Sequence, residues 1–413
     1  ITAECDAAAA LLPTDYVAAT GNQADYGRAT KGAALALKAR VLLYAASPLM
    51  NQNRADDPGR LVSYGNYDVN RWKLAADAAQ AVISLNQYSL FRKVTPYFYN
   101  QFLNGLTYAS ANSEMVFAFL PATTTQNNMI RETICNPPSR PTRYQSGSNV
   151  SCWPLQELVD AFGMSNGKAL NDPGSGYPGI GDNMYLNRDP RFYATITYNG
   201  GLRFLSGFSG DQPVWTYTGV IPSSSSPAVN GALTDGIYTS LGTKTGYYAY
   251  KMLCNNVAGG GVELNRPRML IRYAEVLLNA AEANNELNGP SEQIYNWLKD
   301  IRNRAGISPG TDGMYGMKAG MSQTEMRLFL QNERQVELAF EEHRFFDVRR
   351  WKIAPAVLNK DMHGMEITRA ADGKFSYRTI VVRSNTFRDA MYWFPIAQAE
   401  LTKSPALKQN PGY

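Results

Sequence analysis

Two consecutive amphipathic stretches in the C-terminal half constrain the fold more than any other part of the chain. The first, over 269–289, repeats apolar residues at intervals of three and four, which predicts one apolar helical face. The second, over 291–306, begins with a serine suited to an N-cap and ends with a glycine suited to a C-cap. Because only Pro290 separates them, the helices must pack antiparallel, as in tetratricopeptide-type repeats.

The side of the first helix opposite its apolar face is polar. We therefore expect an amphipathic helix that lies on the surface and exposes these side chains. They are Arg272, Glu275, Asn279, Glu282 and Glu286.

A second helix pair is predicted near the start of the chain. One helix opens at Thr30, carries alanines that allow close packing, and is stopped by Pro48. After a polar loop, Asn70 is placed to cap the next helix, in which Trp72 faces inward. This pair resembles the first one but has a longer connection.

Between about 87 and 262 no periodicity persists, and Gly, Ser, Pro, Asn, Thr and Tyr dominate. A helix is predicted over 155–163 and short strands over 115–120 and 194–198. We interpret this part as a loop-rich excursion packed against the helix pairs, where binding residues tend to occur. The predicted organisation is a helical region over 1–86, the excursion over 87–262 and a C-terminal helical region over 263–413.

The C-terminal region continues with a capping box, in which Ser322 is followed three residues later by Glu325. It opens what we expect to be one long helix reaching Trp351. A strand-like stretch over 365–383 and a short helix over 396–402 complete the prediction.

Composition excludes several classes of protein. Hydrophobic residues make up 44% of the chain, but charged residues interrupt every apolar run, so no membrane span is predicted. The net charge of +5 comes from interleaved charges, which argues against nucleic-acid binding. The chain has two histidines, His343 and His363, which disfavours a histidine-ligated metal centre and a Ser-His-Asp triad. The four cysteines show no CxxC spacing, and their disulfide pairing cannot be assigned from the sequence.

Four stretches in a fixed order carry a resemblance to a known family. They are NRDPRFYATITYNG (187–200), RYAEVLLNAAEANNELNG with IRNRAGI, NERQVELAFEEHRFFDVRRWK, and FPIAQAEL with the terminal LKQNPGY. Together they resemble the SusD/RagB family, nutrient-binding lipoproteins on the outer-membrane surface of Bacteroidetes. The similarity runs over essentially the whole chain.

The resemblance implies a mainly α, SusD-like fold: tetratricopeptide-like helix pairs form a frame, with the loop and short-strand excursion packed on it. It also implies four such pairs and docking as a lid on a SusC-like TonB-dependent transporter. Family members are anchored to the outer membrane through an N-terminal lipidated cysteine. Cys5 has no lipobox before it, so we expect the anchor, and an N-terminal region that supplies part of the ligand site, to lie upstream of Ile1.

The ligand site is predicted within the aromatic-rich part of the excursion. Aromatic faces stack on the C–H faces of sugar rings, and Trp215 and Tyr217 occupy a polar stretch with few apolar residues that could bury them. Most tyrosines here are expected to fill a loop-rich core instead. The predicted ligand-binding residues are Trp215, Tyr217, Arg203, Asp211, Tyr247 and Tyr248.

A glycine-rich loop over 171–183 carries Asp172 and Asp182, together with several carbonyls. These oxygen ligands suit a structural calcium ion, although the loop lacks the ligand ladder of an EF-hand. The alternative is an ordinary flexible loop. No other cofactor is predicted.

The carboxylates Glu333, Glu337 and Glu341 resemble a catalytic acid pair, but their spacing along one helix suits ion pairs better. The same holds for the turn that contains Arg188, Asp189 and Arg191, where we expect ion pairs rather than a site. No catalytic residue is predicted.

The leading hypothesis is a non-catalytic cell-surface protein that captures oligosaccharides and passes them to a SusC-like transporter. A peptide-capturing RagB-like protein of the same architecture is the first alternative, and peptides would need backbone partners or an exposed strand edge. A glycan hydrolase on a helical frame and a helical scaffold for a protein partner are the others.

Overall fold

The computed structural model of the chain describes residues 1–54, 57, 59–92, 108–120, 152–204, 211–219, 235, 242–251 and 267–413. The predicted mainly helical class is confirmed within these ranges. The helices are α1 (Thr2–Leu11), α2 (Tyr16–Thr20), α3 (Lys31–Ala46), α4 (Asn70–Ile83), α6 (Gln156–Ala161), α7 (Pro190–Thr195), α8 (Tyr273–Asn288), α9 (Glu292–Ala305), α10 (Gln323–Glu337), α11 (Arg344–Arg350), α12 (Ala354–Leu358) and α13 (Gln398–Lys403).

The strands are short, apart from one long hairpin. They are β1 (Met115–Phe119), β2 (Ile196–Thr197), β3 (Leu202–Phe204), β4 (Asp211–Pro213), β5 (Thr218–Gly219), β6 (Tyr248–Ala249), β7 (Arg268–Arg272), β8 (Asp361–Arg369) and β9 (Phe375–Ser384). Among described strands, β1 pairs with β7, β2 with β6 and β3 with β4, and β5, β8 and β9 form a three-stranded sheet in that order.

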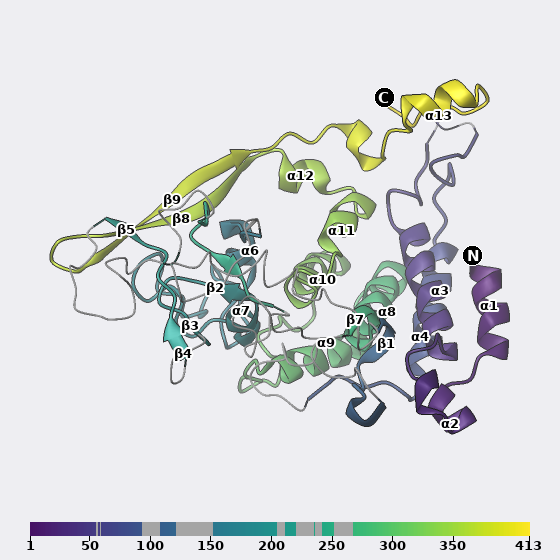
Figure 1. Ribbon diagram of the computed structural model, residues 1–413, viewed down its shortest axis with the longest axis horizontal. Coiled ribbons are helices and arrows are strands. Elements are labelled where there is room, and N and C mark those ends of the chain that lie inside the picture. The colour runs from purple at the N-terminus through teal and green to yellow at the C-terminus, as the bar shows by residue number, and fades with distance from the viewer. Residues whose placement is uncertain are drawn as a thin grey trace.

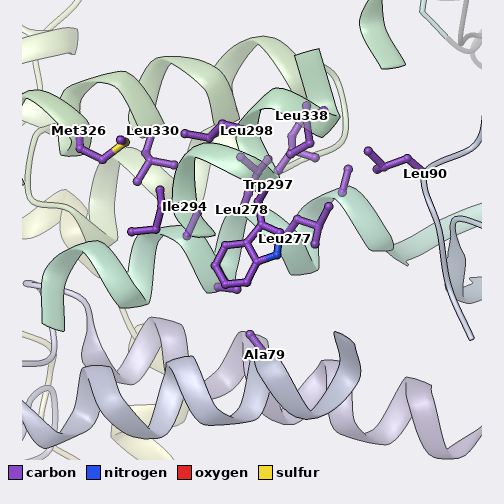
Figure 2. Packing of buried hydrophobic residues seen from close by; sticks show 14 of the residues in the cluster. Ala79, Leu90, Leu277, Leu278, Ile294, Trp297, Leu298, Met326, Leu330 and Leu338 are labelled. Carbon is purple, nitrogen blue, oxygen red and sulfur yellow. The ribbon is translucent and has the colours of Figure 1, made fainter. Parts of the chain in front are cut away.

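Helix α8 lies at the centre of the helical frame and contacts α4, α9 and α10 (Figure 1). Its apolar face packs Leu277 and Leu278 against Ile294 and Leu298 of α9 and Leu330 of α10 (Figure 2). The prediction that α8 is a surface helix is wrong. Its polar side is buried as well, because the frame surrounds it and arginines from neighbouring elements neutralise its carboxylates.

The predicted start of this helix is also wrong. Residues 269–272 belong to strand β7, which pairs antiparallel with β1, and Met115 lies opposite Arg272. The helix therefore begins at Tyr273. A short apolar run fits the spacing of a helix and of a strand equally well. Pairing with the distant strand β1 therefore determines that these residues form a strand.

The predicted end signals of three other helices are confirmed. The side chain of Ser291 accepts a hydrogen bond from the backbone N–H of Ile294, and Gly306 closes α9 in the left-handed conformation. Thr30 caps α3 in the same way as Ser291 caps α9. At the start of α10, Ser322 and Glu325 form the reciprocal capping box.

The long helix predicted to reach Trp351 is interrupted, which is a second correction. Helix α10 ends at Glu337 and α11 begins at Arg344. Between them, Phe340 and Glu342 adopt positive φ angles of 61° and 69°, which are incompatible with a continuous right-handed helix. The break directs the carboxylate of Glu341 toward Arg272.

The hairpin of β8 and β9 extends away from the frame at the end opposite α1–α4 (Figure 1). It covers the predicted strand-like stretch over 365–383 and is longer than predicted. Its inner side packs against a core that includes Met365, Ile367 and Tyr217. In the part of the chain that the structure describes, no helix has the length and apolarity to cross a bilayer.

Candidate functional site

A group of partly exposed aromatic rings lies where the loop-rich excursion meets the hairpin. The rings of Trp215 and Phe375 are nearly parallel, with an interplanar angle of 18° and centroids 6.3 Å apart. Tyr377 follows on the same strand, with its ring centroid 6.5 Å from that of Phe375. We call these three residues the aromatic platform.

Strand pairing brings the platform together. Directly after Trp215 and Tyr217, strand β5 pairs in parallel with β8, so that Thr218 lies opposite Thr368. Strand β8 pairs in turn with β9, which carries Phe375 and Tyr377. The backbone N–H of Trp215 donates to the carboxylate of Asp235 at 2.7 Å, and its carbonyl accepts from the backbone N–H of Asp235 at 2.7 Å.

Tyr217 supports the platform from below. It is 3% exposed, and its ring centroid lies 5.3 Å from that of Phe375 and 5.8 Å from that of Trp215. The hydroxyl of Tyr377 donates to Asp182, and burial together with this carboxylate raises the pKa of Tyr377. The platform thus presents apolar ring surface with a carboxylate at one end, which suits a ligand with both C–H faces and hydroxyls.

The other predicted ligand-binding residues are placed differently. Tyr247 and Tyr248 are 0% exposed; their hydroxyls donate to Gln156 and to the backbone carbonyl of Asp235, both within the core. Arg203 is 6% exposed and stacks over Tyr250 at 4.5 Å. Neither ring of the two tyrosines is open to a ligand, so they fill the core.

Asp211 is exposed on β4, in the two-stranded sheet with β3, and lies outside the platform. Trp215 is thus the predicted residue that belongs to the partly exposed platform, and Tyr217 is the buried support beneath it. The contact of these residues with a ligand stays a prediction.

The two aspartates predicted to bind calcium are already engaged. The carboxylate of Asp172 accepts from the backbone N–H of Ala169 at 3.0 Å, and Asp182 accepts from Tyr377. Among the residues that the structure describes, no three His, Cys, Asp or Glu side chains are grouped to hold a metal ion. Calcium binding by this loop stays a prediction.

The carboxylates on α10 occupy a buried ion-pair network, which agrees with the ion-pair interpretation of their spacing. Glu333 accepts from Arg191 at 2.6 Å and from Arg302 at 3.0 Å. Glu337 pairs with Arg191, with Arg272 at 2.8 Å and with Arg304. The members of this network are Asp189, Glu114, Glu333, Glu337, Glu341, Arg191, Lys251, Arg272, Arg302 and Arg304.

The electrostatics of the network suit structure and not acid–base chemistry. Burial alone would raise the pKa of Glu341, but Arg272 and Lys251 lower it to about 2. The pKa of Glu337 is lowered as well, because its arginine partners outweigh burial. Carboxylates held ionised inside the core lack the raised pKa that a general acid needs near neutral pH.

The turn before α7 departs in part from its predicted ion pairing. Asp189 pairs with Arg191 at 2.8 Å and caps α7, as the prediction required. Arg188, however, donates to backbone carbonyls, including those of Val159 at 2.6 Å and Phe162 at 2.7 Å. This guanidinium ties α6 to the turn through main-chain acceptors.

Sequence reasoning missed Phe375 and Tyr377. They alternate with exposed residues along β9, so both rings emerge on one side of the hairpin. That alternation, following the turn signal Asp372-Gly373, was the local signal available in the sequence. Their proximity to Trp215 depends on the β5–β8 pairing, for which the sequence carries no local signal.

Comparisons with known proteins agree on one family. The model of the SusD family matches residues 113–413. A SusD-like protein P2 of Formosa agariphila is 33% identical over 168 residues, which cover 40% of this chain and 29% of that protein. A SusD-like protein from Bacteroides fragilis is 26% identical, with a TM-score of 0.73, over 100% of this chain and 70% of that one.

A second B. fragilis structure, described as a SusD-like carbohydrate-binding protein, has a TM-score of 0.66 at 22% identity. It covers 98% of this chain and 70% of its own, and at this identity the likeness concerns the fold. The chain thus spans less than a third of the Formosa relative and about 70% of the solved structures.

Proposed function

Because the chain belongs to the SusD family, we propose that it is a non-catalytic cell-surface protein that captures oligosaccharides. The observation that carries the proposal is the near-parallel pair of Trp215 and Phe375, whose rings are partly exposed where the excursion meets the hairpin. Stacking against the C–H faces of sugar rings is the chemistry that such a pair supports. The B. fragilis relative described as carbohydrate-binding shares the fold that carries this surface.

The proposal includes delivery to a SusC-like TonB-dependent transporter and attachment to the outer membrane through a lipid anchor. Its support is family membership. The absence of catalysis is supported by the buried, ion-paired state of the clustered carboxylates Glu333, Glu337 and Glu341. Incubating the protein with glycans and analysing the products by chromatography tests this part, and release of shorter products would contradict it.

The direct test is calorimetric titration of the protein with plant, host and microbial oligosaccharides, alongside mixed peptides. Saturable glycan binding that Trp215→Ala and Phe375→Ala each weaken by about tenfold or more is the expected result. Phe394→Ala is the matched control, because this phenylalanine is 69% exposed and lies far from the platform, stacked on Phe345. Glycan binding with unchanged affinity in both platform variants would contradict the proposed site.

One observation favours peptide capture as the alternative. Strand β9 is the last of the three described strands in its sheet, so one of its edges has no described partner strand. An extended peptide can add to such an edge through main-chain hydrogen bonds. Val381 is 54% exposed on this strand, and a charge there opposes strand addition.

Val381→Lys therefore separates the two ligand classes. If peptides are the ligand, Val381→Lys weakens peptide binding, and Trp215→Ala has a smaller effect. If glycans are the ligand, the order of the two effects is reversed.

A further inference from the structure

The hydrogen bond between Tyr377 and Asp182 gives one end of the aromatic platform a defined polarity. The phenol of Tyr377 donates its proton to the Asp182 carboxylate, and burial together with this carboxylate raises the pKa of Tyr377, so the proton stays on the phenol. A phenol has a single donor, and a carboxylate has none. Both groups therefore offer only acceptor lone pairs to a ligand at this end.

The two acceptors are within reach of a ligand on the rings. Asp182 is exposed and Tyr377 is partly exposed, with its ring centroid 6.5 Å from that of Phe375. Arg378, the next residue on β9, lies on the other face of the hairpin and pairs with Glu366 at 2.7 Å. Among the residues that the structure describes, no lysine or arginine pairs with Asp182.

A cation does lie on the platform face of the hairpin, but at the opposite end. Arg369 is opposite Phe375 in the pairing of β8 with β9, so the two side chains share a face. Nη2 of Arg369 would lie 3.1 Å from a Cβ added to Gly373, which places its guanidinium toward the hairpin tip and away from Tyr377. The charge of Asp182 is therefore not neutralised at its own end of the platform.

We infer that Asp182 determines which ligands the platform binds: the ligand group at the Tyr377 end is a hydrogen-bond donor, such as a hydroxyl or an ammonium, and an anionic group there is rejected. A carboxylate or a sulfate would bring acceptors against acceptors and a like charge against Asp182. The inference rests on the proposed function only in taking the platform as the ligand site. It concerns the polarity of the ligand, and it holds for a glycan and for a peptide.

The test compares ligands that share a backbone and differ in charge. Cellohexaose, maltohexaose and mannohexaose are each titrated by calorimetry beside the same oligosaccharide after oxidation of its primary hydroxyls to carboxylates. We expect every hexasaccharide whose binding depends on Trp215 to lose about tenfold or more in affinity on oxidation. In Asp182→Asn this ratio should fall to about threefold or less, because the amide removes the charge and supplies a donor.

Asp211→Asn is the matched control. It removes the same charge from an exposed position on β4 outside the platform, so it should leave the ratio of the two affinities unchanged. The inference is overturned if the unaltered protein binds an oxidised hexasaccharide as tightly as the neutral one. It is also overturned if Asp182→Asn leaves the ratio at its original value.

A second measurement tests the inference if no hexasaccharide binds, an outcome that would count against the proposed function alone. Benzylamine and benzoate each carry a ring that can stack beside Trp215, and they differ in the sign of their charge. Their binding is followed through the indole N–H resonance of Trp215 in TROSY spectra of the ¹⁵N-labelled protein, assigned with Trp215→Phe.

The net charge of +5 favours benzoate over the whole protein, so a preference for benzylamine has to come from the local site. We expect benzylamine to bind about tenfold more tightly than benzoate, and Asp182→Asn to remove this preference. Benzoate binding as tight as that of benzylamine would overturn the inference. A Trp215 resonance that benzylamine does not shift would overturn it as well.

Discussion

Arg191 and Glu333 lie 2.6 Å apart, and each side chain is 1% exposed. This contact joins the first turn of α7 to α10, so two stretches of sequence that each resemble the SusD family meet inside the protein. A buried ion pair stabilises little in net terms, because desolvation offsets much of the attraction. Removing one partner is costly, however, because the remaining charge stays buried without compensation.

Glu337→Ala should therefore lower the free energy of unfolding by about 3–5 kcal/mol. Glu337 is 0% exposed and pairs with Arg191, Arg272 and Arg304, which would all lose this partner. Denaturant titration followed by circular dichroism measures the loss. The matched control is Glu366→Ala, which removes an exposed pair with Arg378 and should cost about 0–1 kcal/mol.

Stability should also fall steeply in acid. Neighbouring cations outweigh burial and lower the pKa of Glu341 and of Asp347 to about 2 each, against about 4.3 and 3.9 in an unfolded chain. Their contribution is complete above about pH 5 and is lost as the pH falls toward 2. Urea unfolding at pH 7, 5, 4 and 3 checks this, and Glu341→Gln should flatten the acid limb. A free energy of unfolding that does not change between pH 7 and pH 3 would contradict these lowered pKa values.

Loss of the Trp215 ring or of the Phe375 ring should weaken oligosaccharide binding by about tenfold or more, which corresponds to about 1.4 kcal/mol. Trp215→Phe should retain part of the affinity, because a smaller ring still stacks beside Phe375. Calorimetry measures each variant, and thermal unfolding shows whether the fold persists. An affinity for Trp215→Phe no better than that for Trp215→Ala would argue against stacking.

Gly246→Ala should disturb the hairpin that carries Phe375. Gly246 has a φ of 80°, and an added Cβ would lie 2.3 Å from the carbonyl oxygen of Met365 on β8. Gly313 has a φ of 64° with nothing within 4 Å of an added Cβ, so Gly313→Ala isolates the backbone strain of about 1–2 kcal/mol. The steric clash should add roughly 1–3 kcal/mol for Gly246→Ala, and ligand affinity should fall with it. Equal destabilisation of the two variants would show that β8 shifts away from the added Cβ with no loss of stability, which would contradict the steric prediction.

The sequence predicted helix ends correctly where the residues that mark an end lie within one turn of it. Ser291, Gly306 and the Ser322–Glu325 box act within one turn, so the ends they mark could be located from the sequence. Strand β7 could not be located from the sequence, because its partner β1 comes from a distant part of the chain. The burial of Glu275 and Glu282 was missed for the same reason, since their arginine partners lie on other elements.

The candidate site was predictable in part. The polar surroundings of Trp215 in the sequence indicated a ring without an apolar environment, and the structure leaves that ring partly exposed. Tyr247 and Tyr248 carry no comparable signal, and the structure encloses both rings. Phe375 and Tyr377 could be located on a strand, but they lie close to Trp215 only because β5 pairs with β8.

The ion-pair network has a consequence for how such proteins diversify over evolutionary time. Its members are drawn from widely separated segments, including Glu114, Lys251, Arg304 and Glu337. A change in one charge requires a reciprocal change in a distant segment, so drift at these positions is constrained. The hairpin tip and the exposed side of β9 contribute no member to this network, so changes there require no matching change in a distant segment. Descendants of one ancestor can therefore acquire new ligands through these outer parts while inheriting an almost unchanged interior.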